Sequence, residues 1–342
     1  MSSAARPVPL AISLGDPAGI GPEIIAESWA NVSAKSPGKD QPTVFFVVGG
    51  VEVLRAAAQA RGLDCPLIPI AQAHEALNAF HAGLPVLAGL DTPYTPGKPT
   101  AEGAQLAFSS LKWATDLTLN GEAAGLVTAP VEKAGLAAQG FDYPGQTEFL
   151  ADVCGKPARD AVMMLAGPSL RTVPLTVHAP LSEVPKMLTP ELIIHKTVIT
   201  MAGLIRDFGI ERPRLAIAAL NPHASEGGQF GDEEERIITP AIEAMRAEGM
   251  DVTGPVPADA LFMPRMRQTY DSAICMYHDQ ALIPLKTLEV DEGVNVTLGL
   301  PIIRTSPDHG TAFDIAGTGK ADPGAMIAAI TMAGNMARAR GA

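Results

Sequence analysis

The 342-residue chain is poor in positive charge. It has 25 Lys and Arg against 37 Asp and Glu, which gives a formal net charge of −12, and it contains no dense run of cations. Proteins that bind nucleic acid gain most of their affinity from clustered cations that contact the phosphates. The composition therefore argues against a nucleic-acid partner.

Cysteine and long apolar runs are also scarce. Cys65, Cys154 and Cys275 have no paired spacing, which indicates a reducing compartment. No uninterrupted apolar run reaches the roughly 18 residues that a membrane-spanning helix needs; the longest, 325–337, contains Asn335. Segment 1–12 lacks the apolar region of a secretory signal. We therefore expect a cytoplasmic protein without a membrane partner.

The sequence does contain short β-type runs that alternate with helical stretches. The expected strands are 8–14, 43–48, 125–128, 161–165, 170–177, 214–220, 272–277 and 294–298, and the expected helices are 22–34, 102–120, 190–208, 233–248 and 323–338. Strands separated by whole helices predict an α/β fold with a largely parallel sheet. The segment 83–99, rich in proline and glycine, is expected to be the loosest stretch.

Three of the seven histidines share one position relative to the expected strands. His178, His223 and His278 each follow a strand candidate at or just beyond its carboxyl end. In an open α/β sheet the ligand crevice lies outside those ends, where three imidazoles can meet on one ion. Three histidines with open positions for water or substrate are typical of a catalytic metal site. Alternatively, each histidine caps a strand or satisfies a turn.

Acidic and glycine-rich neighbours add further candidates. Asp279 can orient the imidazole of His278, or it can cap the helix that follows. Segment 15–23 can bind an anion through backbone N–H groups, but it lacks the spacing of a Rossmann or P-loop motif, and a tight turn is the alternative. In segment 309–319, Asp314 suits ribose hydroxyls, or it satisfies the N–H groups of its own loop.

A few cations lie near the expected strand ends and polar loops, and they are candidates for binding a small anion. Lys133, Lys286 and Arg304 all lie in or beside such segments. In a chain of net charge −12, a metal ion together with these side chains could hold an anionic substrate. The alternative for each of them is a solvated position on the surface.

Several of these segments together resemble one enzyme family. Nearly the whole chain resembles 4-hydroxythreonine-4-phosphate dehydrogenase of vitamin B6 biosynthesis, through 15–23, 128–133, 145–149, 221–228, 254–262, 276–286 and 295–319. These stretches occur in the family's order and at its spacing. Segment 309–319 also resembles the adenosine-binding loop of isopropylmalate dehydrogenases.

The resemblance implies a fold and a domain organisation. We expect two α/β/α domains with largely parallel sheets, similar to isocitrate and isopropylmalate dehydrogenases, and an active site in the interdomain cleft. The cofactor-side domain is expected to combine residues 1–130 with 295–342. Residues 131–294 are expected to form the domain for metal, substrate and dimerisation.

The resemblance also implies roles for individual residues. The implied metal ligands are His178, His223 and His278; the substrate contacts are Gln146, Thr147, Lys286, Asn295 and Arg304; the cofactor contacts are His309, Gly310, Thr311, Asp314 and Gly317. Lys286 or Asp279 is the expected proton relay. At residue 146 the chain departs from the family, which usually has histidine there, and glutamine cannot carry positive charge.

The implied activity is NAD-dependent oxidation of 4-phosphooxy-L-threonine at C3, followed by decarboxylation to 3-amino-2-oxopropyl phosphate. The implied cofactors are NAD and one divalent metal per site, which can be zinc, cobalt, magnesium or manganese. A carboxylate at Asp314 should repel the 2′-phosphate of NADP. The implied assembly is a homodimer whose metal site takes His178 from the neighbouring subunit.

Two further kinds of function remain open at this point. A related dehydrogenase could act on a phosphorylated four-carbon sugar acid or on a cyclohexadiene diol carboxylate. Gln146 keeps this open because a non-phosphorylated acid needs less positive charge at that position. A zinc hydrolase could use the same three histidines to activate water. A non-catalytic binding protein would leave the set of histidines and cations unexplained.

Overall fold

The computed structural model describes residues 7–34, 43–289 and 292–342. Residues 1–6 of the segment considered for a secretory signal lie outside these ranges. The chain divides into two compact units, which are Met1–Ala158 with Leu300–Ala342 (unit 1) and Arg159–Gly299 (unit 2). Segment 131–158 therefore lies in unit 1 by its contacts, whereas the sequence-based limits were placed at 130/131 and 294/295.

Unit 1 contains a parallel sheet. Its strands are β1 (Leu10–Ser13), β2 (Phe45–Val48), β3 (Leu67–Ile70), β4 (Leu84–Leu87), β5 (Leu126–Thr128) and β12 (Arg304–Pro307), in the order β3-β4-β2-β1-β5-β12. Every pairing among these strands is parallel. Strands β1, β2, β4 and β5 are buried along their whole length, as strands of a sheet covered on both faces are.

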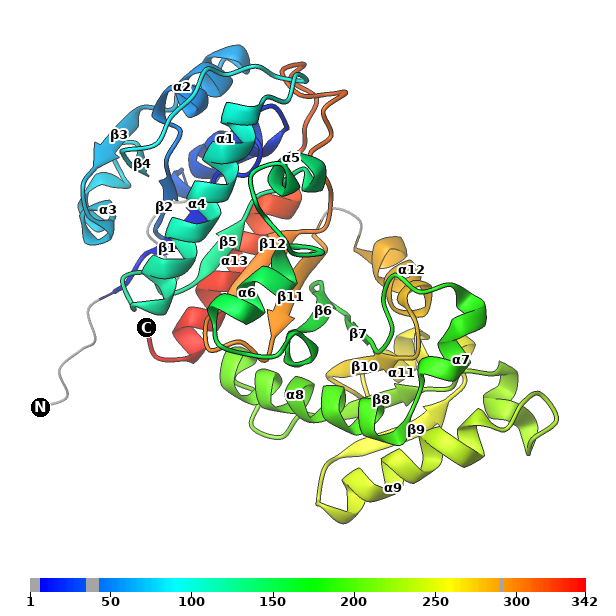
Figure 1. Cartoon of the computed structure of the whole chain (residues 1–342). Coiled ribbons are helices and arrows are strands. Elements are labelled where there is room, and N and C mark those ends of the chain that lie inside the picture. The colour runs from blue at the N-terminus through cyan, green and yellow to red at the C-terminus, as the bar shows by residue number, and fades with distance from the viewer. Residues whose placement is uncertain (1–6, 35–42, 290–291) are drawn as a thin grey trace, which may run out of the picture. The chain divides into compact units, whose positions relative to one another are not determined.

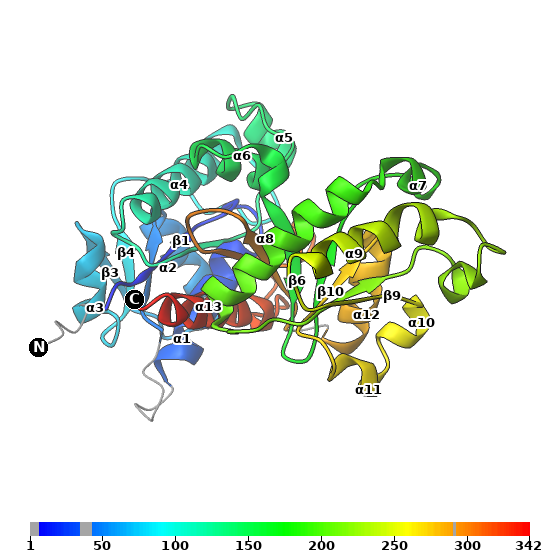
Figure 2. The same cartoon turned by 90° about the horizontal axis from the view of Figure 1, so that it is seen from below.

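Helices cover both faces of the unit 1 sheet. They are α1 (Gly21–Ser33), α2 (Val51–Ala60), α3 (Ala76–Ala79), α4 (Ala101–Leu119), α5 (Lys133–Ala137), α6 (Gln146–Val153) and α13 (Gly324–Ala339). Helices α4, α5 and α6 lie on one face, and α1 and α13 lie on the other (Figures 1 and 2). The unit is therefore an α/β/α sandwich.

Unit 2 has a mixed sheet with a parallel majority. Its strands are β6 (Val162–Ala166), β7 (Arg171–Pro174), β8 (Leu215–Ala218), β9 (Val252–Val256), β10 (Ser272–Cys275) and β11 (Val294–Leu298), in the order β11-β6-β7-β10-β8-β9. Strand β6 runs antiparallel to both of its neighbours. The remaining pairs, β7 with β10, β10 with β8 and β8 with β9, are parallel.

Helices also pack on the unit 2 sheet. They are α7 (Val184–Met187), α8 (Pro190–Phe208), α9 (Thr239–Ala247), α10 (Ala258–Leu261), α11 (Pro264–Arg267) and α12 (His278–Leu288). Helices α8 and α9 contact each other on one face, and α12 contacts β6, β7 and β10 on the other (Figure 2). A turn of π-helix, Glu234–Ile238, precedes α9.

The α/β class and the largely parallel pairing predicted from the sequence are confirmed. Each strand and helix candidate overlaps an observed element. The expected loose stretch 83–99 contains β4, so that expectation was wrong for its first part. In the described ranges no single helix has the length and apolar composition to cross a membrane, although the bent pair Leu181–Met187 and Pro190–Phe208 passes by those criteria.

Candidate active site

The predicted site residues fall into two groups, one in each unit. In unit 2, β7, β10 and β8 are adjacent and parallel, so their carboxyl ends lie at one edge of the sheet. His178 follows β7, His278 is the first residue of α12 after β10, and His223 lies in the turn after β8. This edge is where ligands bind in open α/β sheets.

His178 and His278 lie side by side. Their ring centroids are 6.0 Å apart. Both line a cavity of about 260 Å³, together with Thr176, Val177, Ala179, Leu181, Val184, Tyr277 and Asp279. Two imidazoles at this separation can bind a single ion between them. The described chain thus brings together two of the three predicted metal ligands.

Asp279 contacts the ring of its neighbour. Its Oδ1 lies 2.7 Å from Nδ1 of His278. Because a carboxylate can only accept a hydrogen bond, this contact places the proton on Nδ1 and leaves the lone pair of Nε2 for a metal. The N-cap of α12 is Tyr277, which makes no side-chain capping bond. The contact supports an orienting role for Asp279 over a capping one.

His223 lies apart from this pair. Its ring packs against Phe230, with centroids 6.2 Å apart. Within the described ranges, no three His, Cys, Asp or Glu residues are placed to hold one metal ion. A complete three-histidine site therefore needs a ligand from elsewhere. That the neighbouring subunit supplies His178 stays a prediction.

The backbone around His223 adopts an unusual conformation. His223, Ala224, Ser225 and Glu226 have φ values of 53°, 52°, 63° and 45°. The left-handed region costs a residue with a side chain roughly 1–2 kcal/mol. Such strain persists only where the surroundings hold the chain, and it clusters at functional sites. In Figures 1 and 2 the yellow-green segment between β8 and α9 projects away from the strands of unit 2.

A buried carboxylate holds the base of this turn. Oε1 of Glu234 accepts hydrogen bonds from the backbone N–H of Leu220 at 2.8 Å and of Asn221 at 2.7 Å. Its Oε2 accepts from Nδ2 of Asn221 at 2.9 Å. Glu234 was not among the residues predicted from the sequence, because only the fold brings the π-helical turn against the end of β8.

Lys286 and Asn295 belong to unit 2 as well. Lys286 is exposed on α12, seven residues after Asp279. Positions seven apart on a helix share a face and lie about 10 Å apart along its axis. Asn295 is half-buried on β11 and is paired with Leu165 of β6.

Arg304 is the centre of the group in unit 1. It is the first residue of β12 and is 5% exposed. Its Nη2 donates to Oγ1 of Thr128 at 2.8 Å and to Oε1 of Gln146 at 3.4 Å. Burial lowers the pKa of the Arg304 guanidinium to about 10, so the side chain is still charged at neutral pH. Thr128 is a polar residue at a strand end, and that signal could have identified it from the sequence.

Gln146 and Thr147 begin helix α6. Nε2 of Gln146 donates to the carbonyl oxygen of Ala129 at 3.5 Å. Both residues are half-buried and lie in the first turn. The N–H groups of a first helical turn are available to anions. Together with Arg304 they form a site that can bind a small anionic group.

The loop 309–319 is attached to the start of α1. The backbone N–H of Ile20 donates to the carbonyl oxygen of Thr311 at 2.9 Å, and the N–H of Gly317 donates to Glu23. Asp314, between these two attachments, is exposed, as are His309 and Gly310. Segment 15–23 is therefore a packed turn whose glycines allow close approach, because a Cβ on Gly19 would lie 2.8 Å from the Thr311 oxygen.

Two α/β units of mostly parallel strands, a pair of histidines at a sheet edge and a buried arginine with two polar partners are features of an α/β enzyme. The model of the family described as pyridoxal phosphate biosynthetic protein PdxA matches residues 41–333. The chain belongs to this family.

Curated relatives agree over nearly full length. A 4-hydroxythreonine-4-phosphate dehydrogenase from Erythrobacter litoralis is 58% identical, with 97% of each chain covered. One from Zymomonas mobilis subsp. mobilis is 52% identical, with 97% of this chain and 96% of the relative covered. The chain is accordingly a dehydrogenase, an enzyme of the oxidoreductase class.

Solved structures extend the comparison. The 4-hydroxythreonine-4-phosphate dehydrogenase of Klebsiella pneumoniae has a TM-score of 0.84 at 39% identity, with 98% of this chain and 99% of that chain covered. A terephthalate 1,2-cis-dihydrodiol dehydrogenase from Burkholderia xenovorans LB400 has a TM-score of 0.66 at 28% identity, with 96% and 98% covered. The fold thus also serves a dehydrogenase with a different substrate.

Proposed function

We propose that this chain oxidises 4-phosphooxy-L-threonine at C3 with NAD⁺ and that the 3-oxo acid then loses CO₂, which gives 3-amino-2-oxopropyl phosphate. The observation that carries this proposal is the pair His178 and His278 in a member of a dehydrogenase family: their ring centroids are 6.0 Å apart, and Asp279 contacts the ring of His278. The reaction requires groups for the phosphate, the reacting hydroxyl, the departing proton and the cofactor.

Arg304, Gln146 and Thr147 are the proposed phosphate contacts. The buried guanidinium of Arg304 is held by Thr128 at 2.8 Å, so little side-chain entropy is lost when it pairs with an anion. Gln146 offers amide N–H groups, and Thr147 offers a hydroxyl. Asn295 is proposed to bind the substrate from β11.

One divalent metal ion per site, zinc, cobalt, magnesium or manganese, is proposed to bind His178, His223 and His278. The donor set fits, because three neutral imidazoles leave open positions, and the contact with Asp279 keeps Nε2 of His278 available. A bound ion supplies positive charge that stabilises negative charge on the substrate oxygen.

The proton relay is assigned to Lys286. Asp279 is engaged by His278, which leaves it an orienting role. Lys286 lies on the same face of α12 as Asp279, and its side chain is flexible and exposed. We propose that its ammonium group exchanges protons with the substrate.

NAD is proposed to bind the loop 309–319 through His309, Gly310, Thr311, Asp314 and Gly317. The exposed carboxylate of Asp314 suits two ribose hydroxyls, and it should repel the 2′-phosphate of NADP. Gly310 has nothing within 4 Å of the position of a Cβ, so a ligand can approach its backbone closely.

A homodimer is the proposed assembly. Because His223 lies apart from the other two histidines and its turn projects from unit 2, we infer that His223 of a second copy completes each metal site. This differs from the assignment implied by the sequence, in which His178 is the shared ligand. A cytoplasmic location is also proposed, since Cys65, Cys154 and Cys275 are all free thiols.

A dehydrogenase with another substrate is the second candidate. Gln146 and the likeness to the terephthalate dihydrodiol dehydrogenase favour it, because a substrate without phosphate needs less positive charge. A cyclohexadiene diol carboxylate would be such a substrate, and a phosphorylated four-carbon sugar acid is the other alternative. The dehydrogenase names of the relatives speak against a zinc hydrolase.

NADH formation by the purified protein tests both candidates. The assay compares 4-phosphooxy-L-threonine with a phosphorylated four-carbon sugar acid and a cyclohexadiene diol carboxylate, before and after metal removal and replacement. We expect turnover with the phosphothreonine, loss after chelation and recovery with added metal.

A pair of variants accompanies this assay. His223→Ala should abolish turnover without unfolding the protein, whereas His74→Ala, at an exposed position in unit 1, should behave as wild type. Full activity after exhaustive metal removal would refute the metal role. Turnover with the diol or the sugar acid alone would replace the proposed substrate.

A further inference from the structure

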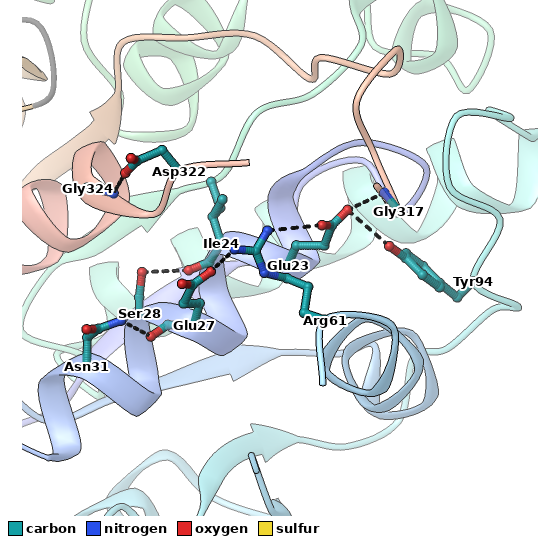
Figure 3. A network of polar contacts seen from close by, with 10 residues as sticks. All are labelled: Glu23, Ile24, Glu27, Ser28, Asn31, Arg61, Tyr94, Gly317, Asp322 and Gly324. Carbon is teal, nitrogen blue, oxygen red and sulfur yellow. Dashed lines mark hydrogen bonds and ion pairs between the residues drawn. The ribbon is translucent and has the colours of Figure 1, made fainter. Parts of the chain in front are cut away.

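Glu23 is a buried carboxylate that the proposed reaction does not use. It lies in the first turn of α1 and has no exposed surface. Burial of a charged group is unfavourable unless the group is paired and hydrogen-bonded. A buried Glu23 carboxylate therefore needs hydrogen-bond or charged partners, and Figure 3 shows partners from three other segments around it.

The partners of Glu23 connect α1 to the loop 309–319. Oε1 of Glu23 accepts hydrogen bonds from the backbone N–H of Gly317 and from the hydroxyl of Tyr94, the latter at 3.3 Å. Oε2 faces Nη1 of Arg61 at 3.4 Å. The Arg61 guanidinium also pairs with Glu27, one turn further along α1. Burial and the nearby Glu23 carboxylate raise the pKa of Tyr94, which keeps its hydroxyl a donor.

The loop is therefore held at two points. Near its start, the carbonyl oxygen of Thr311 accepts a bond from the N–H of Ile20 at 2.9 Å. Near its end, Gly317 is bonded to Glu23 and packs against Pro96, which a Cβ on Gly317 would meet at 2.8 Å. The exposed Asp314 lies between these attachments.

We propose that Glu23 is a positioning residue for the cofactor: it fixes the Gly317 end of the loop so that Asp314 and the loop backbone face the adenosine ribose of NAD before NAD binds. The inference rests on the proposed function, which assigns NAD to this loop. A loop ordered in advance loses less conformational entropy on binding, so affinity rises. Glu23 itself touches neither cofactor nor substrate.

Glu23→Gln tests the proposal, because it keeps the shape of the side chain but has one acceptor oxygen for donors on two sides. Loss of a hydrogen bond to a charged group corresponds to about a tenfold change in an equilibrium constant. We expect the Kd and KM for NAD to rise about tenfold, with kcat at saturating NAD and the KM for the phosphothreonine within about twofold.

Glu27→Gln is the matched control. It removes a carboxylate from the same Arg61 without touching the loop, so NAD binding should stay within about twofold of wild type. If Glu23→Gln unfolds at a markedly lower temperature than wild type, Glu23→Asp serves instead. It keeps the negative charge for Arg61, but its side chain is one methylene shorter, so its oxygens lie farther from Gly317.

Hydrogen exchange of the ligand-free protein supplies a measurement independent of turnover. Amides of 312–319 should exchange about tenfold faster in Glu23→Gln than in Glu27→Gln. Equal exchange in the two variants, or faster exchange with an unchanged Kd for NAD, would overturn the positioning role. If wild-type protein binds no NAD, the proposed function fails and the inference falls with it; if wild type and Glu23→Gln bind NAD equally, only the inference fails.

Discussion

Gln146 stands where the family resemblance implies a histidine, and its Oε1 accepts a hydrogen bond from Arg304 at 3.4 Å. A neutral amide can accept this bond and donate from Nε2 at the same time. A protonated imidazole cannot accept, but it adds a positive charge for phosphate. Compared with a protonated histidine, Gln146 therefore lacks a positive charge for the phosphate but accepts a hydrogen bond that helps to hold Arg304 in place.

Gln146→His is expected to tighten binding of the phosphorylated substrate. The added charge appears as pH falls through the histidine pKa near 6.5. The KM should drop about threefold at pH 6 relative to the wild type, and by less at pH 8. Steady-state kinetics of both proteins at several pH values measure this. A KM ratio that stays at one from pH 6 to 8 would show that residue 146 does not contact the phosphate.

Many residues of the candidate site could be predicted from their residue type and their position in the sequence. Histidines at strand ends and the few cations near the glycine-rich and polar segments could be chosen as candidates, because their ability to bind a metal or an anion belongs to the side chain itself and does not depend on knowing its neighbours. The sequence did not reveal that Glu23 and Glu234 are buried partners of distant backbone, because a glutamate in a first helical turn is ordinarily explained by the helix dipole. Their partners, Gly317 and Leu220, are assigned by packing alone.

At the scale of elements, the start of β10 is tied to the start of β8 by one carboxylate. Oδ2 of Asp271 accepts from the backbone N–H of Arg214 at 2.8 Å, and its Oδ1 faces Nη2 of Arg214 at 3.1 Å. Burial by itself would raise the pKa of Asp271, but the bonds from Arg214 outweigh it and hold the pKa below its ordinary value of 3.8. The charged form is thus favoured in the folded state.

Asp271→Asn should lower the free energy of unfolding by about 1–2 kcal/mol at pH 7, the loss of hydrogen bonds to a charged group. A carboxylate with a depressed folded-state pKa stabilises the protein above its unfolded-state pKa and loses that effect as pH falls through the folded-state value. The difference between variant and wild type should therefore shrink below about pH 4. Denaturant titrations from pH 7 to 2.5 measure it.

Asp232→Asn is the control for this experiment, because Asp232 pairs with Arg236 while both side chains are more than half exposed. It should change stability by no more than a few tenths of a kcal/mol, about what exposed pairs contribute. An Asp271→Asn effect of that same size would mean that the tie between β8 and β10 contributes nothing special.

The turn between β1 and α1 depends on glycine. Gly15 has a φ of +74°, and a Cβ there would lie 2.5 Å from the carbonyl oxygen of Pro130. Gly62 has a similar φ of +65° but nothing within 4 Å of the Cβ position. An alanine at Gly62 would therefore suffer backbone strain alone, whereas an alanine at Gly15 would suffer the same strain and a steric overlap with Pro130.

Gly15→Ala is expected to lower the free energy of unfolding by about 3 kcal/mol, and Gly62→Ala by about 1 kcal/mol. Strain in the left-handed region acts on both, whereas the overlap with Pro130 acts on the first alone. Thermal and denaturant unfolding give the comparison. Equal losses would show that the turn relaxes and that its close packing is not required.

At the scale of the whole molecule, the proposed metal site needs three histidines, and within the described residues the chain places only two of them, His178 and His278, side by side. A symmetric dimer gives each site the same composition, so a residue absent from a site in one chain can be supplied by the other chain. His223 on its projecting turn is the residue that this arrangement assigns to the partner.

Mixed dimers decide which histidines share a chain. If His178 and His278 act from one chain and His223 from the other, His223→Ala co-expressed with His278→Ala leaves one intact site in each mixed dimer. Random pairing then restores about a quarter of the wild-type rate. His178→Ala with His278→Ala should restore none, since neither chain keeps the pair. Recovery in that second mixture would show instead that His178 is the ligand supplied by the neighbouring subunit.

The amino-acid sequence by itself determined the α/β class, the largely parallel pairing and nearly all strand and helix positions that it predicted, because apolar runs, helix starts and turn residues act over a few neighbours. Three features were decided by the tertiary structure alone: the antiparallel placement of β6, the anchoring of loop 309–319 by Glu23, and the pairing of His178 with His278 without His223 among the described residues. Those features depend on which surfaces pack together, and packing joins residues that no local pattern connects.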